Sequence, residues 1–151
     1  MRKGGGHSKG SAFERKIAKE IVKVFRKRFK WVKQADCWRS VLSGGHEMSA
    51  GDLRLTPEFR KVFPYAVECK FYRKIDWWRF LLPHKKSGKE WKWVQQAITG
   101  ANKEKGLWPI LVMKCNHGPT IVCRPPLPSE SGWRYDLWST FLKDVVKWAH
   151  E

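Results

Sequence analysis

Two short segments carry the residues whose types and spacing could do chemistry. Residues 51–55 (GDLRL) contain Asp52, and residues 65–71 (YAVECKF) contain Glu68 and Lys70. Both segments read as strands, and because side chains alternate between the faces of a strand, Glu68 and Lys70 share one face. The connection between the segments is short, which predicts antiparallel pairing. That pairing would bring Asp52 beside Glu68 and Lys70.

Two carboxylates and a lysine on one sheet face suit the hydrolysis of a phosphate ester. Carboxylate oxygens are ligands for Mg²⁺, which keeps several waters and also contacts substrate phosphates. The metal lowers the pKa of a bound water and neutralises charge on the attacked phosphate, and a lysine nearby steadies the developing negative charge. The competing interpretation is a solvated surface salt bridge between Glu68 and Lys70.

Composition restricts the partners of the chain. Its 151 residues suit one domain with a real core, and the formal charge is +17, which predicts a polyanionic partner such as nucleic acid. No apolar run reaches the length needed to span a membrane, and no basic amphipathic helix stands apart. The start of the chain lacks the apolar segment of a signal peptide, so we expect a cytoplasmic protein without a membrane partner. We expect the four cysteines to be reduced.

The elements around these residues can be predicted in chain order. Residues 1–10 are basic and glycine-rich and read as a flexible arm, followed by a single domain over residues 11–151. A helix is expected from Ser11, because apolar residues recur there at helical spacing. Glu14 either completes a capping box with Ser11 or points at the metal site as a further carboxylate.

Further along the chain, a first strand is expected near Trp31, and a loop before Asp52 carries Arg39, Ser40 and Ser43 as candidate phosphate ligands. The basic and aromatic residues between 73 and 93 suit base stacking, a subunit interface or ordinary core.

The second half of the chain alternates predicted helices and strands. Residues 91–103 read as a helix, residues 108–115 as a strand buried on both faces, residues 120–124 as a returning strand and residues 135–149 as a last helix. In the middle of the first of these helices, Gln95 or Gln96 is expected either to face the site as a DNA contact or to lie on a polar helix surface. Together these elements predict an α/β fold with a central mixed β-sheet flanked by helices.

In their order these motifs resemble the PD-(D/E)xK nuclease superfamily, and within it the archaeal-type Holliday junction resolvases with their phage-borne relatives. Five features carry the resemblance: the opening helix at residues 9–15 (KGSAFER), Arg39-Ser40 with Ser43-Gly44, Asp52, Glu68-Cys69-Lys70, and the buried strand over residues 108–114.

The resemblance implies a restriction-endonuclease-like core and a Mg²⁺-dependent endonuclease, with Mn²⁺ as a substitute ion, that resolves four-way DNA junctions by paired nicks as a homodimer. The implied metal ligands are Glu14, Asp52 and Glu68, with Lys70 assisting the water. Arg15 and Arg39 would hold backbone phosphates, and Ser43 would bind near the scissile phosphate. Two alternatives stay open: a nuclease of the same superfamily that acts on flaps, ends or duplex DNA, and a basic DNA-binding protein without catalysis.

Overall fold

The computed structural model describes residues 5–41, 50–78, 88–126 and 132–150. A four-stranded mixed sheet in these residues has the strand order β3-β4-β5-β6. Strands β3 and β4 are parallel, whereas β5 is antiparallel to both β4 and β6. The strands are β3 (Tyr65–Tyr72), β4 (Trp108–Cys115), β5 (Thr120–Arg124) and β6 (Arg134–Leu137). This arrangement confirms the predicted α/β class and its mixed sheet.

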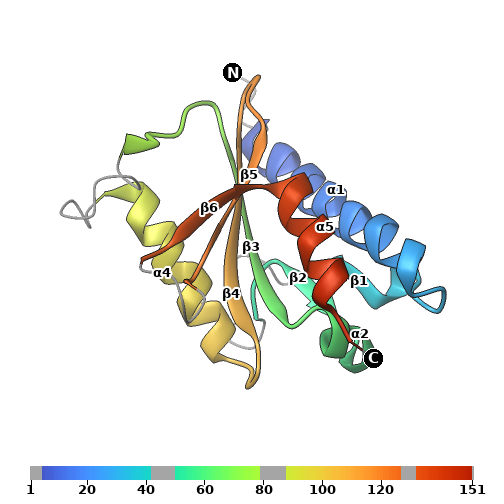
Figure 1. Cartoon of the computed structure of the whole chain (residues 1–151). Helices are drawn as coiled ribbons and strands as arrows, with labels where there is room; N and C mark the ends of the chain where they lie inside the picture. Colours follow the sequence, from blue (N-terminus) through green and yellow to red (C-terminus); the bar gives the residue numbers. More distant parts are fainter. Residues whose placement is uncertain (1–4, 42–49, 79–87, 127–131, 151) are drawn as a thin grey trace.

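Helices cover both faces of the sheet (Figure 1). Helices α1 (Gly5–Arg28) and α5 (Trp138–Trp148) lie on one side, and α4 (Lys89–Asn102) lies on the other. Because β4 is central and covered on both faces, its residues from Ile110 to Met113 are fully buried, as a continuous apolar run predicts. No helix in the described part of the chain is both long and apolar enough to cross a membrane.

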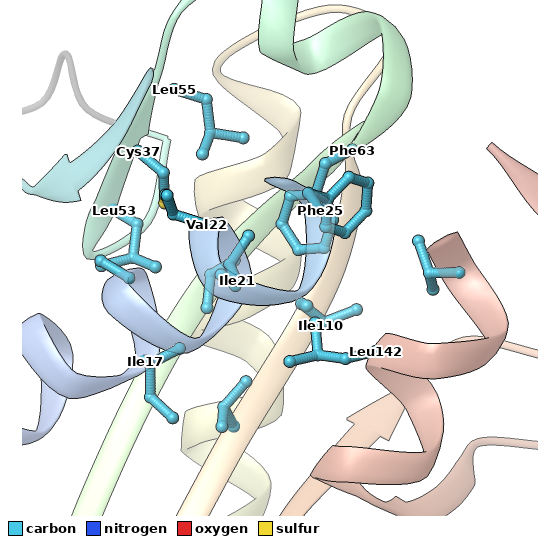
Figure 2. Packing of buried hydrophobic residues seen from close by; sticks show 14 of the residues in the cluster. Ile17, Ile21, Val22, Phe25, Cys37, Leu53, Leu55, Phe63, Ile110 and Leu142 are labelled. Carbon is cyan, nitrogen blue, oxygen red and sulfur yellow. The ribbon is translucent and has the colours of Figure 1, made fainter. Parts of the chain in front are cut away.

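The larger hydrophobic core lies between α1 and the sheet (Figure 2). The apolar stripe of α1, which includes Ile17, Ile21 and Phe25, packs there against residues such as Ile110 of β4 and Leu142 of α5. A second cluster on the opposite face joins α4 to β4 and β5. This packing fixes α1 relative to β3, and with it the positions of the candidate site residues that these two elements carry.

The predicted antiparallel pairing of the strand after Asp52 with β3 is wrong. Strand β2 (Leu53–Leu55) pairs with β1 (Cys37–Arg39) in a separate two-stranded sheet, while β3 pairs with β4. The reason lies in the connection, where Thr56 accepts a hydrogen bond from the Phe59 amide and caps helix α2 (Pro57–Val62). A helix therefore replaces the tight return that pairing would need.

Three further boundaries differ from the sequence prediction. Helix α1 begins at Gly5, so residues 5–10 are helical and Ser11 lies inside the helix, where it does not cap the first turn. The chain near Trp31 forms no strand, and β1 begins at Cys37 after a short 3-10 helix (Gln34–Asp36). The last helix begins at Trp138 because residues before it form β6, whose Tyr135 lies opposite Cys123 of β5 and packs on the second cluster.

Candidate active site

Asp52 lies along the free edge of β3. Its backbone N–H donates to the Val67 carbonyl at 2.7 Å, and its own carbonyl accepts from the Ser40 amide at 2.8 Å. Its carboxylate oxygen Oδ2 accepts from the Cys69 amide at 2.7 Å. Asp52 thus satisfies backbone groups that an edge strand otherwise leaves unpaired. The side chain reaches the Glu68–Lys70 segment as predicted, although by a route that involves no ladder between β2 and β3.

Gly51 makes this close approach feasible. Its φ of +81° lies in the left-handed region, and a Cβ added there would stand 2.5 Å from the Val67 carbonyl oxygen. On the other side, a Cβ on Gly100 of α4 would lie 3.2 Å from the Gly51 nitrogen. Two glycines therefore let the Asp52 segment fit between β3 and α4. The sequence analysis assigned neither glycine a role, and the Gly-Asp dipeptide was the available signal.

Glu68 and Lys70 form an ion pair on β3, with Lys70 Nζ 2.7 Å from Glu68 Oε1. Their side chains are only 13% and 18% exposed, respectively, which is too enclosed for the solvated surface salt bridge considered from the sequence. The pair lies beside Asp52, whose charge interacts with both residues. The three residues predicted to converge therefore do so.

Glu14 enters the same region from α1. Its Oε2 accepts a hydrogen bond from Arg39 Nε of β1 at 2.5 Å, and the two side chains are 13% and 27% exposed. Glu14 is therefore an ion-pair partner and does not cap the helix. Arg39 already has a carboxylate partner, so a DNA phosphate would have to share or displace it.

Burial and the neighbouring carboxylates make ionisation of Asp52 unfavourable. The net pKa of Asp52 is raised to about 7, mainly by burial and further by the negative charges of Glu68 and Glu14. The hydrogen bond from the Cys69 amide and the charge of Lys70 act in the opposite direction and lower it. At neutral pH the site therefore holds negative charge that the protein only partly compensates. An added cation would relieve that repulsion.

Lys70 is a cation in this arrangement. Burial by itself lowers the pKa of Lys70, but the charge of Glu68 and its hydrogen bond outweigh burial, so the net pKa lies above the ordinary value. A protonated amine donates hydrogen bonds and does not accept a proton. The chemistry open to Lys70 is therefore orientation of a water or phosphate oxygen, or stabilisation of negative charge.

The donor set fits a divalent metal only in part. Within the described ranges, no group of three His, Cys, Asp or Glu side chains is arranged to hold a metal ion. Two of the three acidic side chains are instead engaged by cations, Glu14 by Arg39 and Glu68 by Lys70. Asp52 and Glu68 nevertheless offer the hard oxygen ligands that Mg²⁺ prefers.

The residues predicted to contact DNA are found in different environments. Arg15 is exposed on α1, and Gln95 is exposed on α4. Ser40 is fully buried, and its Oγ has no hydrogen-bond partner among the described residues. Ser43 lies outside the described residues, as do residues 1–4 of the predicted arm and residues 79–87 of the basic and aromatic segment.

The outer face of α1 is strongly basic. An open groove of about 360 Å³ on this face is lined by Ala12, Arg15, Lys16, Lys19, Glu20 and Lys23. Its one acidic residue, Glu20, accepts a hydrogen bond from Trp138 Nε1 at 2.9 Å and pairs with Lys16. The helix thus presents its apolar stripe and Glu14 inward and a row of cations outward, which suits a polyanion.

The four cysteines are free thiols, as predicted, and burial raises the pKa of Cys37 to about 12. Burial also raises the pKa of Cys69, although this residue lies within the site. Because a thiol must ionise to act as a nucleophile, neither residue suits that role.

Comparison with known protein families finds a match over most of the chain. A family model described as "Phage putative PDDEXK endonuclease" matches residues 5–136, which span most of the chain and every described candidate residue. No curated protein and no solved structure matches the chain.

Proposed function

Because the chain belongs to the phage PD-(D/E)xK endonuclease family, we propose that it is a Mg²⁺-dependent enzyme that resolves four-way DNA junctions by paired nicks. Membership of the family makes it a metal-dependent nuclease whose substrate is DNA. The ion, the branched substrate, a homodimeric assembly and a place in the host cytoplasm are the further parts of the proposal.

The convergence of Asp52, Glu68 and Lys70 at the edge of β3 carries the catalytic part of the proposal. Basic and aromatic residues suit a nuclease and a DNA-binding protein equally well. Enclosed carboxylates oppose phosphate binding unless a cation lies between them. Burial and the charge of Glu68 raise the pKa of Asp52 to about 7, which shows how enclosed this carboxylate is. A non-catalytic binder would have no use for such a cluster.

Asp52 and Glu68 would hold the metal, with Glu14 as a third carboxylate if Arg39 releases it. A bound Mg²⁺ supplies an activated water and neutralises charge on the scissile phosphate. Lys70, as a buried cation, would orient the water or stabilise the charge that develops on the phosphate. The Cys69 amide keeps Asp52 oriented throughout, since its hydrogen bond uses Oδ2.

The proposed DNA contacts come from several parts of the chain. Arg15 and Arg39 would hold backbone phosphates, and Gln95, Ser40 and Ser43 complete the proposed set. Ser40 is fully buried, so its part in DNA binding would require the chain around it to rearrange. Two copies of the chain would place one such site on each of two opposed strands of a junction.

The test uses the full chain with a labelled four-way junction and with linear duplex, each in Mg²⁺ or in chelator. We expect paired, metal-dependent nicks in the junction and little cutting of the duplex. Binding without metal-dependent nicking would reject the catalytic proposal. Equal cleavage of both DNAs would reject the junction resolvase and favour a nuclease of broader substrate range.

The variant Asp52→Asn should cut neither DNA, because the amide is a poor metal ligand, while it binds the junction as well as or better than the wild type. A matched control is Asp144→Asn on α5, which removes a carboxylate that pairs with Lys147 in a largely exposed i,i+3 pair. We expect the control to cut fully. We expect Asp52→Asn to lose cutting but not binding. Normal cutting by Asp52→Asn would contradict the assignment.

A further inference from the structure

Tyr72 borders the candidate active site. It is the last residue of β3, and the alternation of side chains along a strand puts it on the same face as Glu68 and Lys70. Its interaction with Lys70 is one of the contributions that raise the pKa of that lysine. Whatever occupies the space next to Tyr72 therefore lies one strand repeat from the residues that would act on a phosphate.

The ring of Tyr72 is fixed on one side and accessible from solvent. It stacks on Trp93 of α4, with ring centroids 4.6 Å apart and planes inclined by 22°. Trp93 is 4% exposed and belongs to the cluster that joins α4 to the sheet, whereas Tyr72 is 38% exposed. The buried indole thus holds the exposed Tyr72 ring in place. Because the ring is already ordered, little conformational entropy of this side chain is lost when a ligand stacks on it.

Lys89 lies beside this ring pair. Its Nζ is 4.1 Å from the centroid of Tyr72 and 5.2 Å from that of Trp93. The ammonium lies over both rings, and these distances place it on the side of Tyr72 that faces Trp93. An aromatic face next to a cation is the combination that single-stranded nucleic acid uses, with the base on the ring and the phosphate at the cation.

We propose that Tyr72 is a stacking platform for an unpaired base of the DNA substrate, with Lys89 at the adjoining phosphate. The inference rests on the proposed function, because it takes DNA as the ligand of the neighbouring site. Bases inside a duplex are stacked on their neighbours and cannot reach a protein ring without being extruded. A base exposed at a branch or in a single strand can, so Tyr72 would favour DNA with unstacked bases.

A purely structural role predicts something different. If the Tyr72–Trp93 pair only fastens the start of α4 to β3, loss of the ring would weaken binding of every DNA to the same extent. A stacking platform affects only DNAs that offer an unpaired base. The two roles can therefore be separated by comparing substrates under conditions without cleavage.

The experiment measures binding of three DNAs in chelator: a four-way junction with 2-aminopurine at its branch point, a single strand with the same base, and a linear duplex. Tyr72→Leu and Tyr72→Met remove the ring while keeping apolar volume, and Tyr72→Phe keeps the ring. Trp108→Leu is the matched control, because Trp108 is 57% exposed at the opposite end of the β3–β4 pair, where it lies opposite Tyr65.

Wild type, Tyr72→Phe and Trp108→Leu should quench 2-aminopurine fluorescence on binding, and the ringless variants should not. The ringless variants should bind the single strand and the junction about 5- to 150-fold more weakly, with duplex affinity within about twofold. Unchanged quenching in both ringless variants, or an equal loss of affinity for all three DNAs in these variants, would overturn the proposal. Failure of wild type to nick the junction in Mg²⁺ would count against the proposed function alone, since quenching is measured without metal.

Discussion

Asp52 shows how the local fold opposes the charge that the chemistry needs. Three hydrogen bonds with neighbouring segments fix its backbone and one carboxylate oxygen, while burial and two further carboxylates disfavour ionisation. When the pKa of a carboxyl group is raised in the folded protein, its ionised form has a higher free energy than it would have in water. Binding of a divalent cation would relieve that cost, so metal affinity should rise with pH as Asp52 loses its proton.

The contribution of Asp52 to the stability of the metal-free protein should fall as pH rises from about 4 to about 7. The pKa of Asp52 is near 4 in the unfolded chain and about 7 in the folded one, so the folded state binds more protons in this interval. The contribution of Asp52 is therefore most favourable below pH 4 and is lost by about pH 7, by at most about 4 kcal/mol. Urea unfolding in chelator at pH 5 and pH 8 measures the change.

Asp52→Asn supplies the comparison for that measurement. The asparagine can still accept the Cys69 hydrogen bond but carries no charge, so the variant should be more stable than the wild type at pH 8 and close to it at pH 4. The control Asp144→Asn should follow the wild-type pH dependence. Parallel curves for the wild type and Asp52→Asn would show that the carboxylate is not in the environment described.

At the scale of elements, the site forms where three of them meet the free edge of β3. Helix α1 brings Glu14, β1 brings Arg39, and the segment before β2 brings Asp52 between β3 and α4. The fit of that segment depends on Gly51, whose position is closed to a Cβ by the Val67 backbone. Catalytic geometry at this edge is therefore coupled to backbone packing.

Gly51→Ala should destabilise the protein by about 2–5 kcal/mol, because it combines left-handed strain with a clash against a backbone that cannot yield locally. Gly10→Ala is the matched control, since Gly10 lies in α1 with nothing within 4 Å of an added Cβ. That change should stabilise the protein by about 0.5–1 kcal/mol. Thermal unfolding of both variants checks the opposite signs; a neutral Gly51→Ala would contradict the packing described.

These elements also show what local sequence can and cannot predict. The continuous apolar run of β4 and the alternation in β3 identified both strands and put Glu68 beside Lys70, since those signals come from burial and strand geometry. The pairing of β2 was not predictable in this way, because Thr56 with Pro57 turned a presumed tight connection into helix α2. The Arg39–Glu14 pair depends on contacts between residues 25 positions apart, which periodicity does not encode.

At the scale of the whole molecule, the two faces of α1 carry different charges and serve different purposes. The chain carries +17, and the inward face of α1 contributes a carboxylate to the candidate active site while its outward face contributes cations. Family membership makes DNA the substrate, so a surface that holds phosphates beyond the cut is expected. Such a surface raises the affinity for any DNA, so the choice between DNA substrates has to be made at the candidate active site.

The outer face of α1 should therefore control the salt dependence of DNA binding. Lys19→Ala with Lys23→Ala removes two cations of the groove, so the slope of log K against log salt should fall by about 2, one unit for each lost phosphate contact. Lys61→Ala with Lys105→Ala lowers the net charge equally on exposed residues of α2 and the turn after α4, and should change the slope little. Duplex binding in chelator at 50–200 mM salt provides the measurement. Equal slopes for the two double variants would mean that overall charge, rather than this helix face, attracts the DNA.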